Sequence, residues 1–198
     1  MINEKWEQAQ KLERESHHYS KGEGLKIYQE SYRQYFEYLD INPDLEGKKI
    51  VEIGPADFPA LYFCENFEGI VIEPMPSKIL EELCNEKNIK ISRSLAETYQ
   101  YDDRIDEVWL FNVLQHVISP EKIISRANLY SKTIRFFEPI NYGFDDKHLH
   151  NLTLEFFRFW FGIDNVKYYP GNKQAKNFHT HECAYGIGKI CNYIDIKY

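Results

Sequence analysis

Residues 51–61 read VEIGPADFPAL, and residues 108–120 read VWLFNVLQHVISP. In each stretch a run of β-branched and other apolar residues stops at a turn-forming or polar position, Gly54 in the first and Asn112 in the second. Such runs predict buried strands, and the residues that follow them predict loops. In open α/β sheets, ligands bind at the carboxyl ends of the strands, so these loops are where we expect a site.

Three further runs of the same kind predict neighbouring strands. The five expected strands cover residues 49–53, 69–72, 88–91, 105–111 and 133–137. Helical patterns lie between them, for example over 76–86 and 120–130. Strands that alternate with helices favour a parallel sheet covered by helices on both faces.

The two ends of the chain depart from this alternation. Apolar residues at helical spacing predict two N-terminal helices, broken near Gly22 and Gly24. Beyond a helix expected over 154–161, the segments 166–169 and 183–187 predict two strands that complete the sheet as an antiparallel pair.

These patterns together predict an α/β fold. We expect a doubly wound, mostly parallel sheet of about seven strands with an antiparallel C-terminal strand. Residues 1–44 are expected to form an N-terminal helical extension, and residues 45–198 the α/β domain.

The composition narrows the class of partner. A chain of 198 residues with a formal charge of −7 and no basic stripe has room for one sizeable core and argues against a nucleic-acid partner. No apolar run approaches the roughly 20 residues of a membrane span, and no basic-then-apolar leader is visible. The four cysteines show no CxxC spacing, which favours free thiols in a reducing, cytoplasmic compartment. The oligomeric state is left open.

Four stretches together resemble a known family. They are VEIGPADFPAL, VWLFNVLQHVISP, RFFEPINYG at 135–143 and HLHNLTLEFF at 148–157. Over roughly residues 48–160 the chain resembles the class I S-adenosylmethionine-dependent methyltransferases, in particular the branch that acts on small molecules and sugars. The resemblance implies a Rossmann-like fold, S-adenosylmethionine as cofactor, and methyl transfer to a hydroxyl of a small metabolite or sugar.

The physical chemistry of the residues after each strand agrees with this reading. Gly54 permits a tight turn and a close approach of ligand to backbone. Glu73, nineteen positions later, ends the second strand, where a carboxylate can accept hydrogen bonds from both ribose hydroxyls. Met75 and Glu97 would face the adenine. The expected cofactor-binding residues are Tyr19, Glu52, Gly54, Pro55, Ala56, Glu73, Pro74, Met75, Ala96, Glu97, Asn112, Val113 and Leu114.

A carboxylate that binds a ribose fits a nicotinamide cofactor equally well. The loop after the first strand distinguishes the two cofactors. A dinucleotide loop needs three glycines and free N–H groups for the pyrophosphate. Here only Gly54 is present, Pro55 lacks an N–H, and Asp57 would repel phosphate. Carboxylates such as Glu52 and Asp57 instead suit the cationic S-adenosylmethionine.

One departure from the family keeps a second hypothesis open. Ala56 stands where many family members have a second glycine. If its methyl group blocks the cofactor, the chain is a non-catalytic cofactor-binding or scaffold protein with a degenerate methyltransferase fold.

Two histidines are candidate general bases. His116 follows Asn112 by four residues, so a helix starting there would place both on one face, although His116 could simply pack or cap that helix. His148 lies where an acceptor would enter, with His150 on the same side of an extended chain. Neither this pair nor the His179 and His181 pair has a closing carboxylate at ligand spacing, so no metal is expected. Tyr19, in the N-terminal extension, is expected either to cover the cofactor or to belong to a helix packed on the sheet.

Overall fold

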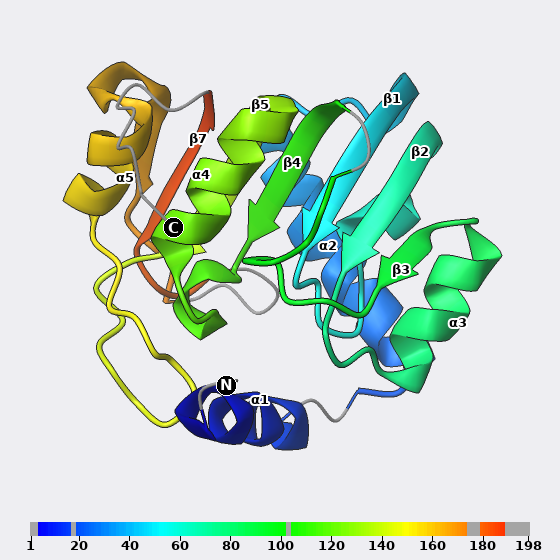
Figure 1. Ribbon diagram of the computed structural model, residues 1–198, viewed down its shortest axis with the longest axis horizontal. Helices are drawn as coiled ribbons and strands as arrows, with labels where there is room; N and C mark the ends of the chain where they lie inside the picture. Colours follow the sequence, from blue (N-terminus) through cyan, green and yellow to red (C-terminus); the bar gives the residue numbers. More distant parts are fainter. Residues whose placement is uncertain (1–3, 17–18, 102–103, 174–178, 189–198) are drawn as a thin grey trace.

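The computed structural model describes residues 4–16, 19–101, 104–173 and 179–188 (Figure 1). The strands are β1 (Asp44–Ile53), β2 (Glu65–Ile72), β3 (Lys90–Ser92), β4 (Ile105–Phe111), β5 (Ser131–Pro139), β6 (Val166–Tyr169) and β7 (Cys183–Gly188). The α-helices are α1 (Glu4–Ser16), α2 (Lys21–Tyr38), α3 (Lys78–Glu86), α4 (Pro120–Tyr130) and α5 (Leu154–Phe161), and short 3₁₀ helices are η1 (Ala60–Phe63), η2 (Leu114–His116) and η3 (Ile163–Asn165).

The strands form one sheet in the order β3-β2-β1-β4-β5-β7-β6. The first five strands are parallel, whereas β7 pairs antiparallel with both β5 and β6. The predicted doubly wound, mostly parallel sheet with an antiparallel C-terminal strand is therefore confirmed. The strand order reverses between β1 and β4, and such a switch point opens a crevice at the carboxyl edge of the sheet.

Two apolar layers cover the two faces of the sheet. Along β4, Val108 and Leu110 pack with α4 and α5, and Trp109 packs with α2 and α3 on the opposite face. Successive residues of a strand point to opposite faces of the sheet, and here both faces of β4 are covered by helices. Among the described segments, no helix has the length and apolar character to cross a membrane.

The break between the first two helices differs from the predicted one. Gly22 and Gly24 lie inside α2, which begins after Ser20, where Ser20 and Glu23 form a reciprocal capping box. Gly24 is needed for packing, because a Cβ there would lie 1.9 Å from Cζ of Phe58. The prediction was wrong because a helical glycine that admits an aromatic ring looks in sequence like a helix breaker.

A buried carboxylate fixes the loop after β4. Glu138, fully buried at the end of β5, accepts hydrogen bonds from the N–H groups of Val113 at 3.0 Å and Leu114 at 3.1 Å. Burial raises its pKa to about 8, although the two N–H donors favour the charged form. The loop that carries Asn112 is thus held by a group whose ionisation the fold disfavours.

This arrangement predicts a pH dependence of stability. Since the pKa of Glu138 is higher in the folded than in the unfolded chain, its contribution is complete below about pH 4.5 and is lost as the pH rises through about 8. We expect the free energy of unfolding to fall by a few kcal/mol across this window. Urea titrations of Glu138→Gln between pH 5.5 and 9 should show a flatter slope than wild type, and exposed Glu65→Gln should not. An unchanged slope in Glu138→Gln would contradict this assignment.

Candidate functional site

A cavity of about 330 Å³ lies at the carboxyl ends of β1, β2 and β4. The helix α1 crosses below these strand ends (Figure 1), and side chains of α1 and α2 close the cavity opposite the strands. Its volume falls at the lower end of the range typical of small-molecule sites. The predicted site residues that line it are Tyr19, Gly54, Pro55, Ala56, Glu73, Pro74, Ala96, Glu97, Asn112, Val113 and His116.

Four predicted site residues do not line the cavity. They are Glu52, Met75, Leu114 and His148. Glu52 is buried beneath the loop after β1, where it accepts hydrogen bonds from Ala60 N at 2.8 Å and Leu61 N at 3.0 Å. Burial raises its pKa to about 7. Leu114 packs fully buried in the core, so the structure gives Glu52 and Leu114 structural positions behind the site.

Glu73 directly follows β2 and lines the cavity. Its Oε1 accepts a hydrogen bond from Met75 N at 3.1 Å, so Met75 orients Glu73 through its backbone. Burial raises the pKa of Glu73, and nearby Arg14 of α1 partly opposes this. In the described part of the chain, no hydrogen bond reaches the other oxygen, Oε2, which leaves an acceptor at the place where the sequence predicts a ribose.

Glu97 combines a lining role with a structural one. Its Oε1 accepts hydrogen bonds from Ile118 N at 2.8 Å and Ser119 N at 3.1 Å, which fixes the turn that leads into α4. Ser119 in turn caps that helix, with Pro120 at its first position. The carboxylate therefore ties the loop after β3 to the loop after β4 at the cavity wall.

The loop after β1 needs glycine for a reason that the sequence does not show. Gly54 has a φ of +61°, and a Cβ there would lie 2.3 Å from Cγ2 of Val113. Close approach of Val113, itself part of the cavity wall, therefore requires this glycine. Ala56 has a φ of +53°, a conformation that favours glycine and costs alanine on the order of 1 kcal/mol. Ala56 is among the residues that line the cavity.

Asn112 and His116 are joined by a side chain instead of a shared helix face. The expected helix from Asn112 is absent from this described segment, which holds only the short η2, so the same-face argument was wrong. Gln115 Nε2 contacts Asn112 Oδ1 at 2.9 Å and His116 Nε2 at 3.2 Å. His116 Nδ1 lies 3.2 Å from the carbonyl of Lys147, which can only accept, so the proton is on Nδ1. Burial lowers the pKa of His116 to about 4, so the ring is neutral.

His148 lies behind His116 with a carboxylate partner. Its Nδ1 is 2.7 Å from Asp145 Oδ2, and its ring centroid is 4.8 Å from that of His116. His150 points to another partner, with its Nε2 2.8 Å from the carbonyl of Val117. Over the described residues, no three His, Cys, Asp or Glu side chains come together as a metal site would require.

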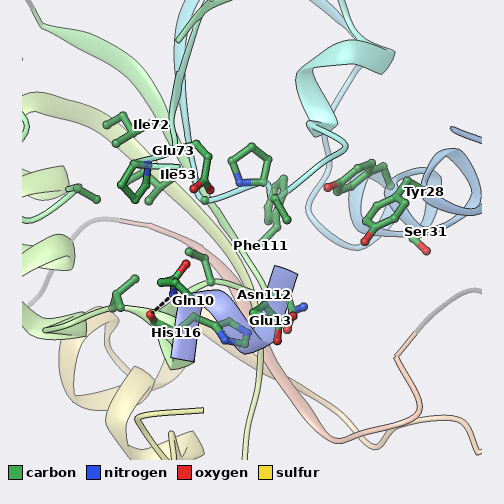
Figure 2. A pocket seen from close by; sticks show the side chains of 18 of the residues that line it. Gln10, Glu13, Tyr28, Ser31, Ile53, Ile72, Glu73, Phe111, Asn112 and His116 are labelled. Carbon is green, nitrogen blue, oxygen red and sulfur yellow. Dashed lines mark hydrogen bonds between the residues drawn. The ribbon is translucent and has the colours of Figure 1, made fainter. Parts of the chain in front are cut away.

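Several lining residues were not predicted. They are chiefly Gln10 and Glu13 of α1, Tyr28, Ser31 and Tyr35 of α2, and His179. Figure 2 shows Tyr28 and Ser31 at the opposite end of the cavity from Ile72 and Glu73. The α2 residues share one helix face, but that spacing equally describes a core-facing helix.

The formal charges of the side chains that line the cavity are all negative. Glu13, Glu73 and Glu97 line the cavity, and the described lining residues include no Lys or Arg. His116 is neutral, and burial likewise lowers the pKa of His179 to about 4. The cavity is therefore suited to a neutral or cationic ligand and unsuited to a pyrophosphate.

The Gly54 contact yields a prediction about stability. Gly54→Ala introduces both an unfavourable φ and an overlap with Val113, so we expect it to destabilise the fold by ~2–4 kcal/mol. Thermal unfolding followed by circular dichroism measures this loss. The double variant Gly54→Ala/Val113→Ala should recover part of it, and a single variant that unfolds at the wild-type temperature would refute the packing argument.

No family model and no curated protein matches the chain. Solved structures do match it. The N-methyltransferase NodS from Bradyrhizobium japonicum WM9 has a TM-score of 0.59 at 12% identity, over 84% of this chain and 98% of NodS. The StiE O-MT fragment has a TM-score of 0.58 at 10% identity, over 83% of this chain and 75% of the fragment.

A third match is the N-terminal domain of EvdMO1 with S-adenosylhomocysteine bound. Its TM-score is 0.52 at 14% identity, over 80% of this chain and 79% of that domain. NodS, too, has been solved in complex with S-adenosylhomocysteine. At such identities the likeness establishes the fold, and this chain has the Rossmann-like fold of the class I S-adenosylmethionine-dependent methyltransferases.

Proposed function

We propose that this protein binds S-adenosylmethionine and transfers its methyl group to a hydroxyl of a small metabolite or sugar. One observation carries the proposal. The cavity at the switch point of the sheet is lined by three carboxylates and, in the described segments, by no Lys or Arg. A cofactor with a sulfonium and an ammonium group suits this lining, whereas a dinucleotide would place its phosphates against like charge. The neighbours that contain S-adenosylhomocysteine share this fold.

The described residues give each part of the cofactor a partner. Glu73, with Oε2 open to the cavity, would accept hydrogen bonds from the ribose hydroxyls, and Pro74, Ala96 and Glu97 would enclose the adenine. Gly54, Pro55 and Ala56 would lie along the methionine part, together with Asn112, Val113 and Tyr19. Tyr28 lies at the far end, and its hydroxyl makes no hydrogen bond to another described residue, so it could donate to the cofactor carboxylate.

The bound cofactor would supply an electrophilic methyl group, and the protein has to orient the acceptor and take up its proton. His116 lines the cavity as a neutral imidazole, but a pKa of about 4 makes it a weak base. His148 does not line the cavity but lies beside His116, with Nδ1 held by Asp145, so in our proposal Nε2 is the nitrogen that takes up the proton. We therefore assign His116 to acceptor orientation and His148 to proton uptake.

The resemblance alone favours oxygen over nitrogen as the acceptor atom, and the acidic lining argues against a phosphorylated acceptor.

The described cysteines, Cys64, Cys84 and Cys183, are buried and free, and burial raises the pKa of each thiol. Free thiols support our inference of a cytoplasmic location.

Isothermal titration calorimetry tests the cofactor. We expect S-adenosylmethionine and S-adenosylhomocysteine to bind with micromolar Kd, and Glu73→Ala to weaken both by roughly 10–100-fold through loss of a charged acceptor. The control, Glu68→Ala, removes an exposed carboxylate from the middle of β2 and should bind as wild type. NAD binding in place of S-adenosylmethionine would support an oxidoreductase instead.

Measuring turnover distinguishes an enzyme from the non-catalytic alternative. That alternative is suggested by Ala56, whose backbone has a left-handed conformation. A set of hydroxylated metabolites and sugars is screened for S-adenosylhomocysteine formation, and one accelerating acceptor would exclude a scaffold role. With that acceptor, His148→Gln should lower kcat about 100-fold or more while the Kd of S-adenosylhomocysteine stays unchanged. Wild-type kcat in His148→Gln would remove the base assignment.

A further inference from the structure

One carboxylate of α1 faces the cavity. The helix is attached through buried Trp6 and Ala9 and through Gln10, whose Nε2 donates to the His116 carbonyl at 3.0 Å. Glu13 follows Gln10 by three residues, one helical turn, and both line the cavity. Figure 2 shows Glu13 on the side of the cavity formed by α1.

Glu13 lies along the middle of the cavity. In the view of Figure 2 it sits between the Glu73 end and the Tyr28 end, on the α1 side that also carries His116. Its electrostatic influence agrees with this position. Burial dominates the low pKa of His116 and the high pKa of Tyr28, and Glu13 acts on both groups, raising the pKa of each. A charge at the centre of the cavity would therefore lie within reach of this carboxylate.

The charge at that centre changes during the proposed reaction. With the ribose at Glu73 and the amino-acid carboxylate at Tyr28, as proposed above, the cofactor sulfur would lie between these two residues. The bond from sulfur to the methyl carbon breaks as the acceptor oxygen bonds to that carbon, and the acceptor proton passes to the base. The sulfur is a cationic sulfonium before this step and a neutral thioether after it.

We propose that Glu13 distinguishes the substrate form of the cofactor from the product form by this charge, an inference that rests on the proposed function. The carboxylate attracts the sulfonium and thereby holds α1 over the loaded cavity. Loss of the methyl group removes the attraction, and α1 is held less tightly over S-adenosylhomocysteine. Glu13 thus acts as a binding residue that couples the chemical step to product release.

The test compares three ligands that differ at one position. S-adenosylmethionine and sinefungin carry a positive charge at or next to the sulfur position, whereas S-adenosylhomocysteine is neutral there. Calorimetry on the full chain should give a preference of roughly fivefold to tenfold for the charged ligands. Glu13→Gln should abolish this preference by weakening only the charged pair. Hydrogen exchange in residues 4–16 should be slower with sinefungin than with S-adenosylhomocysteine, both at saturation, and equal in the variant.

Glu15→Gln is the matched control, because it makes the same charge change on an exposed position of the same helix. It should keep the wild-type preference. Equal weakening of all three ligands by Glu13→Gln would indicate a merely structural role and overturn the inference, as would an unaltered preference in that variant. If S-adenosylhomocysteine fails to bind even the wild type, the proposed function itself fails. If it binds as tightly as sinefungin, only the role of Glu13 is lost.

Discussion

Three buried glutamates hold the loops from which the cavity is made. Glu52, Glu97 and Glu138 each accept hydrogen bonds from two consecutive backbone N–H groups at the carboxyl edge of the sheet. Beyond the strand ends these N–H groups have no ladder partner, and leaving them buried and unpaired would cost roughly 1–3 kcal/mol each. The carboxylates replace the missing ladder, and the raised pKa of Glu52 and Glu138 shows the electrostatic cost of burying them.

The same residue type also determines what the cavity can bind. Glu73 and Glu13 face the cavity itself, whereas Glu52 and Glu138 lie behind its wall. Since Glu13, Glu73 and Glu97 line the site and none of the described lining residues is Lys or Arg, its potential is negative, and anionic ligands are disfavoured whatever their shape. Loop architecture and ligand charge are linked at Glu97, which both fixes the turn before α4 and lines the cavity.

The sequence predicted the bounds of those helices and strands whose buried residues follow a regular apolar pattern. The bounds predicted for β4, α4 and α5 agree with the structure, because their apolar runs end at clear turn or capping residues. β1 is longer than predicted, because Asp44 to Lys48 pair with β2 through an irregular register that carries polar residues. Gly24 was misread as a breaker because its reason is a contact with Phe58, far away in sequence.

The candidate site shows where local patterns stop being informative. The residues after β1, β2 and β4 could be predicted, since topology alone brings them to one edge. Those on α2 could not, because the face that carries Tyr28 and Tyr35 has the spacing of any helix packed on a sheet. Glu13 is a different case. It shares the face of α1 that buries Trp6 and Ala9, and a carboxylate on a buried stripe is unfavourable unless something compensates its charge. Its place on that face is visible in the sequence, but the cavity beneath it is not, because the strand ends that complete the cavity come from distant parts of the chain.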